Sequence, residues 1–269
     1  MERAAEPERQ AADGFFVRRI DGEEMALWAQ AQALYAAQGA DGVWALRAPP
    51  ADGDSGMREA QAETMCAAAN RPDSAGAEAP GAASVPLAAA ELWGLFRADQ
   101  GAVQFAALCG GGDALSPAAA LRKTGFAPQG AQLVLPPAGA APCTGAPLLL
   151  RTLQQRARQR AEMEIGAKAP ADVPDTFCLA VLPVKTGAPL LPAYFAAGFA
   201  LRAMRPLAWL RPHYLFLPAA VCGSSQTLPG RSIMVAVENS LLLSRLLAEG
   251  WMGVGMRGEK IALVRGEAL

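Results

Sequence analysis

The sequence predicts a mixed α/β fold, and three observations support this prediction. Short apolar segments typical of strands alternate along the chain with segments whose apolar residues recur at helical spacing. Glycine, proline and small polar residues separate these segments. Hydrophobic residues make up 52% of the 269 residues and charged residues 18%, with a net charge of -1, which is typical of a globular chain.

The chain is expected to open with a strand followed by a helix. An apolar and charged run over residues 14–21 predicts the strand. Met25, Trp28 and Tyr35 fall close to helical spacing within residues 22–38, and a glycine follows as a stop signal.

A less regular stretch comes next. Residues 43–46 fit either a short strand or the start of another helix, and residues 57–69 predict an alanine-rich helix. Small residues and prolines over residues 70–86 offer nothing large to bury, so they predict a loop inserted within one domain.

A hairpin is predicted by two apolar runs, Leu92–Phe96 and Ala102–Cys109, joined by a charged turn that ends in glycine. Ser116 and Pro117 are typical of a helix start, and that helix is expected to end at Gly125. Residues 131–135 then predict a further strand.

The clearest helix covers residues 148–165, where an apolar stripe alternates with a polar face at a period of 3.6. The continuous apolar run of residues 177–184 predicts a buried strand, followed by a Gly/Pro turn and a short helix that ends near Ala197. Gly198 is expected to adopt the left-handed conformation of a helix C-terminus, with Phe199 packing back on the helix.

The remainder of the chain is also expected to be mixed α and β. Residues 201–210 and 213–217 predict two strands. The tail from Ile233 repeats this succession with a strand, a helix over residues 241–248 that stops at a glycine, and a last pair of strands over residues 253–256 and 260–264.

Composition disfavours several classes of function. The balanced charge offers no general attraction for nucleic acid, and every apolar run is cut well short of the ~20 residues that a membrane helix needs. The first residues mix acids with arginines and lack an apolar core, so we expect a cytoplasmic protein without a secretory signal. Five scattered cysteines and a single histidine, His213, predict neither a disulfide framework nor a metal site.

The string Tyr-x-x-x-Gly-Phe occurs at residues 194–199, in the short helix that follows the buried strand. This string, together with the order of elements from Phe15 to Leu217, resembles acetyltransferases of the GNAT superfamily. The resemblance implies a mostly antiparallel, twisted sheet flanked by helices over residues 15–217. Residues 218–269 would then form a strand-helix-strand extension packed on the same domain.

The resemblance also implies a coenzyme site between two strands. In this family the strands that correspond to residues 131–135 and 177–184 lie side by side but splay apart, and the pantetheine arm of acetyl-CoA enters the gap. A glycine-rich turn and the N-terminus of the next helix hold the pyrophosphate through backbone N–H groups. The residues implied to bind the coenzyme are Leu133, Val134, Leu135, Thr144, Gly145 and Ala146.

Tyr194 is the residue to which the resemblance gives a catalytic role. It would act as the general acid that protonates the departing thiolate of coenzyme A, while the acetyl group passes to the amine of a small molecule or peptide. The alternative for the same residue is a ring packed in the core, with its hydroxyl bonded to a backbone carbonyl.

The sequence departs from the family at the glycine-rich turn. The family turn begins with Arg or Gln, whereas Pro142 stands at this place, and Pro147 closes the turn; neither proline has an N–H to give. The Asn that the family often has near residues 185–187 is missing. No spacing singles out a general base among the acidic residues available for that role, which are Glu91, Asp99, Asp113, Glu162 and Glu164.

Other reactive or charged side chains have two interpretations each. Arg202, Arg205 and Arg211 form a basic region without acids that fits an anion site or a solvated edge strand. Cys143 and Cys178 fit either an activated thiol near the predicted gap or ordinary apolar packing.

Three functions from different classes stay open. The chain could be an acetyl-CoA-dependent N-acyltransferase, a protein of the same fold that binds a ligand or partner without turnover, or an unrelated α/β interaction protein. The two prolines of the turn favour the second over the first, and the order of elements disfavours the third.

Overall fold

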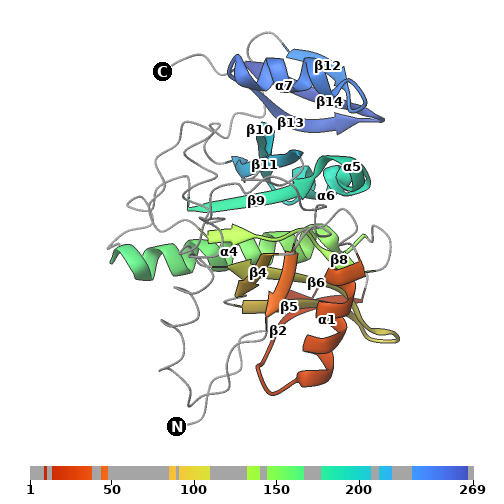
Figure 1. The fold of residues 1–269 in the computed structure, drawn as a ribbon, viewed down its shortest axis with the longest axis vertical. Helices are drawn as coiled ribbons and strands as arrows, with labels where there is room; N and C mark the ends of the chain where they lie inside the picture. The colour runs from red at the N-terminus through yellow and green to blue at the C-terminus, as the bar shows by residue number, and fades with distance from the viewer. Residues whose placement is uncertain are drawn as a thin grey trace, which may run out of the picture.

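Strand pairing joins most of the described chain into one long sheet (Figure 1). The computed structural model describes residues 9–10, 14–37, 44–47, 85–88, 91–109, 132–139, 144–166, 177–206, 212–219 and 232–265. The strands of the long sheet are β1 (Arg9–Gln10), β2 (Phe15–Ile20), β5 (Glu91–Arg97), β6 (Gly101–Cys109), β7 (Gln132–Val134), β8 (Ala138–Gly139), β9 (Cys178–Pro183), β10 (Phe199–Pro206), β11 (Pro212–Pro218), β12 (Ser232–Ala236), β13 (Trp251–Arg257) and β14 (Lys260–Arg265). This 12-stranded sheet has the order β1-β2-β5-β6-β7-β9-β11-β10-β13-β14-β12, with β8 pairing to β6 beside that path.

A small second sheet and six helical segments complete the described structure. β3 (Trp44–Arg47) and β4 (Val85–Ala88) form a separate parallel pair. The helical segments are α1 (Met25–Ala37), α4 (Ala146–Ile165), α5 (Val184–Gly187), the 3-10 turn η4 (Ala188–Leu190), α6 (Leu191–Ala196) and α7 (Ser240–Ala248). The predicted mixed α/β class is confirmed, and the long sheet is mostly antiparallel.

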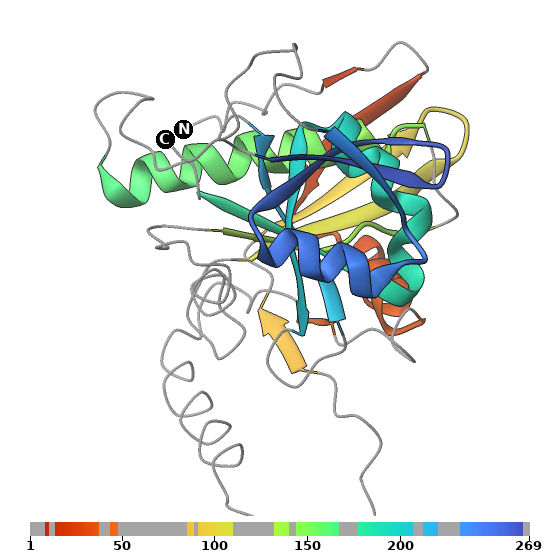
Figure 2. The same cartoon turned by 90° about the horizontal axis from the view of Figure 1, so that it is seen from above.

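Helices cover both faces of the long sheet. Successive residues of a strand point to opposite sides, so the two faces of one strand pack against different helices. In β9, Ala180 and Leu182 belong to a core that includes the apolar stripe of α4, whereas Leu179 and Val181 belong to a second core that includes the buried face of α1. Figure 2 shows α4, in green, and α1, in red, on opposite sides of the central strands. The middle of the sheet is therefore buried on both faces.

Most of the expected elements occur where the sequence placed them. The strand and helix at the start are β2 and α1, the hairpin is β5 and β6, the amphipathic helix is α4, and the repeated tail is β12, α7, β13 and β14. Gly198 has φ +87°, which confirms the left-handed helix end, and Phe199 is buried behind it. These elements depend on local patterns that the chain carries within a few residues.

Some predictions differ from the structure or were left open by the sequence. The strand that was expected to reach residue 184 ends at Pro183, and the expected Gly/Pro turn is a helical turn, α5. Residues 44–47 are a strand, and the predicted loop over residues 70–86 ends in β4. The predicted helices over residues 57–69 and 116–125, most of that loop and residues 207–210 lie outside the described residues.

The chain contains the same structural unit twice in succession. The central unit, residues 178–218, consists of β9, the short helices that end in α6, then β10 and β11. The C-terminal unit, residues 232–265, consists of β12, α7, β13 and β14. In both units the last strand lies between the other two, in the orders β9-β11-β10 and β12-β14-β13.

The two units also match in local detail. A glycine with positive φ ends each helix, Gly198 at +87° and Gly250 at +90°, and an aromatic residue follows it. The register of the next strand shifts at the same distance from that glycine, between residues 201 and 203 and between residues 253 and 255.

The units meet along β10 and β13, which pair antiparallel at Leu201 and Gly253. Each of these residues is the third after its glycine. α6 contacts β13 and α7 contacts β10, so each helix also packs over a strand of the other unit. The two units are therefore related by an approximate two-fold axis, and the C-terminal unit forms one end of the molecule (Figure 1, blue).

Candidate functional site

The centre of the long sheet contains its one parallel pairing among the described strands. β7 and β9 run in the same direction and pair at three positions, residue 132 with 178, 133 with 179, and 134 with 180. The N–H of Gln132 also donates to the Phe177 carbonyl over 2.9 Å. The expectation that these two segments lie side by side is confirmed.

The two strands part after Val134. On one side the chain stays with β6, because the Leu135 N–H donates to Ala107 over 2.9 Å and β8 pairs with β6. On the other side β9 stays with β11 up to Pro183. Residues 135–139 and 181–183 thus lie on two segments that no longer pair with each other, and we call this break in the strand pairing the strand gap.

Tyr194 reaches the strand gap from α6. Its hydroxyl donates to the Val181 carbonyl over 2.9 Å, and Val181 is the first residue of β9 beyond the parallel pairing. The ring is fully buried and stacks on Phe216, with ring centroids 4.6 Å apart. Burial, and to a lesser extent the nearby Cys178, raises the pKa of Tyr194, so the hydroxyl holds its proton. The structure thus shows the buried arrangement that the sequence left as the alternative.

Tyr35 reaches the same gap from the opposite face of the sheet, an approach that no sequence pattern predicted. It lies on α1, is 1% exposed and donates its hydroxyl to the Pro136 carbonyl over 2.8 Å. Burial raises the pKa of Tyr35, and so do Cys109 and Tyr194, which lie within electrostatic range. Helical spacing placed Tyr35 on the buried side of its helix, but its partner lies 101 residues away.

Leu133, Val134 and Leu135, which the resemblance assigned to the coenzyme, have buried side chains that serve the cores. Leu133 and Leu135 face the α1 side, and Val134 faces the α4 side. Only backbone groups of this segment remain to meet a ligand in the strand gap. The Leu135 N–H is already bonded, and the next two residues are prolines without an N–H, so this flank offers carbonyl acceptors.

The predicted phosphate cradle lies at the start of α4. Thr144 is exposed, whereas Gly145 and Ala146 are buried. A Cβ on Gly145 would lie 2.8 Å from Cδ2 of Leu95, so close packing requires glycine at this position. The Leu148 N–H donates to the Gly145 carbonyl and Pro147 has no N–H, which reduces the amide donors that a helix N-terminus ordinarily offers. Pro142 and Cys143 lie outside the described residues.

The acidic residues considered as bases are held by arginines where the structure describes their side chains. Glu91 is 7% exposed and forms a two-pronged ion pair with Arg156, and Trp93 Nε1 also donates to it. Burial raises the pKa of Glu91, but the Arg156 contacts outweigh burial and leave this pKa below its ordinary value. Asp99 pairs with Arg97 and Glu162 with Arg158. Asp113 and the side chain of Glu164 lie outside what the structure describes.

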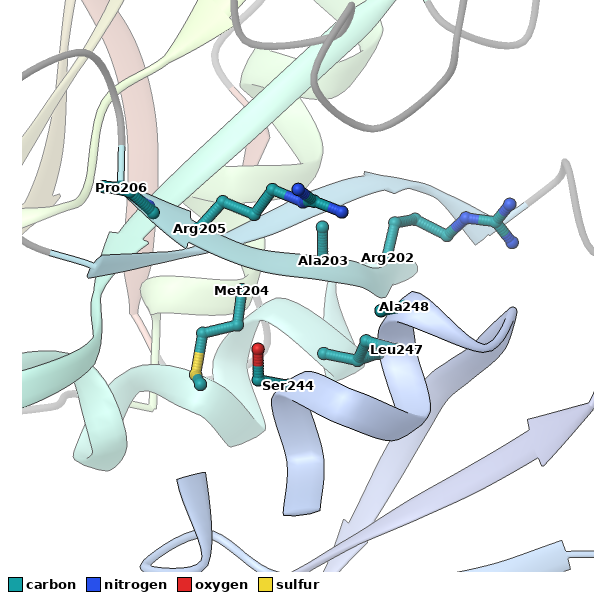
Figure 3. Close-up of a pocket in the computed structure, with 8 residues that line it drawn as sticks. All are labelled: Arg202, Ala203, Met204, Arg205, Pro206, Ser244, Leu247 and Ala248. Carbon is teal, nitrogen blue, oxygen red and sulfur yellow. The ribbon is translucent and has the colours of Figure 1, made fainter. Parts of the chain in front are cut away.

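A surface pocket of about 390 Å³ lies at the junction of the two units (Figure 3). Residues of β10 and α7 line it, namely Arg202, Ala203, Met204, Arg205, Pro206, Ser244, Leu247 and Ala248. Met204 extends toward Ser244 of α7, whereas the two arginine side chains extend away from that helix. The guanidinium groups do not converge on the pocket, so it lacks the arrangement that would hold an anion. Arg211 lies outside the described residues.

The part of the chain that the structure describes also limits two other kinds of site. It contains no group of three or more histidine, cysteine or carboxylate side chains that could hold a metal ion. None of its helices combines the length and the apolar character needed to cross a membrane.

No protein-family model matches this sequence, and searches of curated proteins and of solved structures find no similar protein.

Proposed function

We propose that the chain is an acetyl-CoA-dependent N-acyltransferase with a GNAT-like fold, and that its coenzyme arm binds in the strand gap. The observation that carries the proposal is the parallel pairing of β7 and β9, which stops after three residue pairs in an otherwise antiparallel long sheet. This arrangement is what the resemblance implied for the strands that receive pantetheine. The acceptor would be the amine of a small molecule or a peptide.

The residues that flank the gap fit an arm that contains amide groups. Carbonyls of the segment after Val134 and of Val181 can accept hydrogen bonds from amide N–H groups. The N-terminus of α4 would face the phosphates with its dipole, although Pro147 reduces the number of its N–H donors. Acetyl-CoA supplies an activated acetyl thioester, and the chain supplies its orientation toward the amine.

Tyr194 is the proposed proton donor to the thiolate leaving group. Its hydroxyl lies at the β9 flank of the gap, and burial raises its pKa so that it stays protonated at neutral pH. A protonated phenol can donate a proton and cannot act as a base, but the raised pKa makes Tyr194 a weaker acid than an exposed tyrosine, which favours the second candidate below. The hydroxyl must leave the Val181 carbonyl before it can serve a ligand.

The second candidate function is ligand binding without turnover. It is favoured by the bond that holds the Tyr194 hydroxyl at Val181 and by the close packing around Gly145. On this alternative the strand gap and its acceptors keep their binding role, while Tyr194 is a structural residue.

Two measurements test the proposal. Coenzyme A should raise the melting temperature, because a ligand that binds only the folded chain stabilises it. Tyr194→Phe should show a shift at least as large and reduce acetyl transfer from acetyl-CoA to a panel of amines by at least tenfold. Tyr214→Phe is the matched control, since Tyr214 is also a buried aromatic of the same core but has no role in the gap. Absence of any shift with coenzyme A would contradict both candidates, and a shift without transfer in the unaltered chain would favour the second.

A further inference from the structure

Two tyrosine hydroxyls from opposite faces of the sheet meet the two flanks of the strand gap. Tyr35 comes from α1 and donates to Pro136 on the β7 side, over 2.8 Å. Tyr194 comes from α6 and donates to Val181 on the β9 side, over 2.9 Å. The rings are 1% and 0% exposed, so neither hydroxyl is available to bulk water.

These two carbonyls lie where strand pairing would have continued. The register of β7 and β9 pairs residue n with residue n+46, as in 134 with 180. Continued by one and two steps, it would place Leu135 opposite Val181 and Pro136 opposite Leu182. The carbonyls of Val181 and Pro136, which accept from the tyrosines, thus lie just beyond the last paired residues. At these positions the donor is a side-chain hydroxyl and not the backbone N–H of a neighbouring strand.

The backbone on the β7 side cannot supply a donor to the Val181 carbonyl. Pro136 and Pro137 have no N–H, and the N–H of Leu135 is committed to Ala107 on β6. A buried carbonyl without a donor is costly, so something must serve it in the folded chain. In the structure the two tyrosines do so.

Not every buried tyrosine of this core is placed to make such a bond. The Tyr214 hydroxyl is buried on β11 and has no hydrogen-bond partner within the described residues. Of the three tyrosines, the two that bond a carbonyl are thus the two at the strand gap.

We infer that Tyr35 and Tyr194 are placeholder donors, which occupy the acceptors of the strand gap until the amide N–H groups of a pantetheine-like ligand replace them. This inference rests on the proposed function, since it takes the gap to be the binding site for that arm. The exchange leaves the two carbonyls bonded before and after binding. It also releases the Tyr194 hydroxyl from Val181, so that ligand entry itself would free the proposed proton donor.

The test compares three variants that keep the aromatic ring, Tyr35→Phe, Tyr194→Phe and the control Tyr214→Phe. Without ligand, the first two should lower the melting temperature by about 3–6 °C, because each leaves a buried carbonyl without a donor. The control should not lower the melting temperature, because the Tyr214 hydroxyl serves no partner within the described residues and its removal relieves the cost of a buried unbonded group. Circular dichroism confirms that each variant is folded.

Affinity is then measured by calorimetry with two probes, coenzyme A and pantetheine, which lacks the nucleotide. Tyr35→Phe and Tyr194→Phe should each bind both probes about tenfold more tightly than the unaltered chain, because the ligand no longer displaces a hydroxyl. Tyr214→Phe should bind with unaltered affinity.

Three other outcomes would separate the placeholder role from the proposed function. Variants that lose stability but bind coenzyme A with unaltered or weaker affinity would overturn the placeholder role and leave the proposed function in place. Tighter binding of pantetheine alone, without binding of coenzyme A, would support the placeholder role and overturn the coenzyme-dependent function. Failure of every variant and of the unaltered chain to bind either probe would overturn both.

Discussion

The central unit and the C-terminal unit have the same topology, yet only the central unit carries a candidate site. Both units end a helix at a glycine of positive φ, and both shift register at the same distance beyond it. The difference lies in what surrounds the first strand of each unit. β9 lies between β11 and the parallel strand β7, whereas β12 is the last strand in the order of the long sheet.

The helices of the two units also differ, both in the residue four positions before the glycine and in how the helix begins. Four residues before the glycine, the central unit has Tyr194, fully buried and bonded to β9, and the C-terminal unit has Leu246, which is half-buried. α7 begins with an Asn239 side chain that accepts from the Leu242 N–H, while the helical turns of the central unit begin without a side-chain cap. The helix of the C-terminal unit also leaves Leu241 86% exposed.

The repeated unit alone does not make a site. The Tyr194 hydroxyl has an acceptor in β9 because β7 departs from β9 after three residue pairs and no longer serves the Val181 carbonyl. The C-terminal unit has no counterpart of β7 among the described residues, and its role in the structure is to cover the outer edge of β10. The central unit therefore borders the strand gap through β9, whereas the C-terminal unit covers the edge of β10 through β13.

The largest effect should come from the ion pair that fixes α4 to the sheet beside the central unit. Arg156→Met leaves the Glu91 carboxylate buried without its main partner, and we expect a loss of about 3–5 kcal/mol in the free energy of unfolding. The matched variant in the C-terminal unit, Arg245→Met, breaks an exposed pair with Glu249 and should cost less than about 0.5 kcal/mol. Urea unfolding at pH 7 checks both, and equal losses would show that the two ion pairs do not differ as their burial indicates.

The next effect tests whether α7 is held by core packing. Leu243 is 0% exposed and belongs to the same core as Tyr194, so Leu243→Ala should cost about 2–4 kcal/mol. Leu241→Ala, on the exposed side of the same helix, should change stability by less than about 0.5 kcal/mol. If both variants were neutral, the C-terminal unit would not share the core of the central unit.

A smaller effect measures how closely the two units correspond. Gly198 and Gly250 both have a positive φ, and a Cβ at either would meet nothing within 4 Å, so alanine costs only backbone strain. Gly198→Ala and Gly250→Ala should each lower stability by about 1–2 kcal/mol, and by similar amounts. Gly255→Ala is the control, because its φ is not positive and its surroundings are equally open. A large difference between Gly198→Ala and Gly250→Ala, measured by urea unfolding, would show that the two helix ends are not equivalent.

The elements that the sequence predicted correctly are those whose cause is local. The left-handed conformation of Gly198 follows from the residues around it, and the stripe of α4 follows from its own spacing. The pairing of β10 with β13 joins segments about fifty residues apart, and no local pattern specifies which edges meet. The same limit applies to the site: the string around Tyr194 identified the residue, but its bond to Val181 and the approach of Tyr35 from the other face depend on the tertiary structure.

The dependence of stability on pH below 7 should distinguish the buried ion pair, Arg156 with Glu91, from the exposed one, Arg245 with Glu249. The pKa of Glu91 is lowered in the folded chain, so its contribution is present above the ordinary carboxyl pKa, about 4.3, and is lost as pH falls through the folded value. In Arg156→Met, Glu91 keeps the Trp93 N–H and Arg160 at 3.9 Å but loses its strongest partner, so burial raises its pKa relative to the unaltered chain and less stability is lost as pH falls. The free energy of unfolding measured from pH 7 to pH 3 should therefore fall less steeply in Arg156→Met than in the unaltered chain. Arg245→Met should follow the unaltered chain, because solvent already screens the pair that it removes.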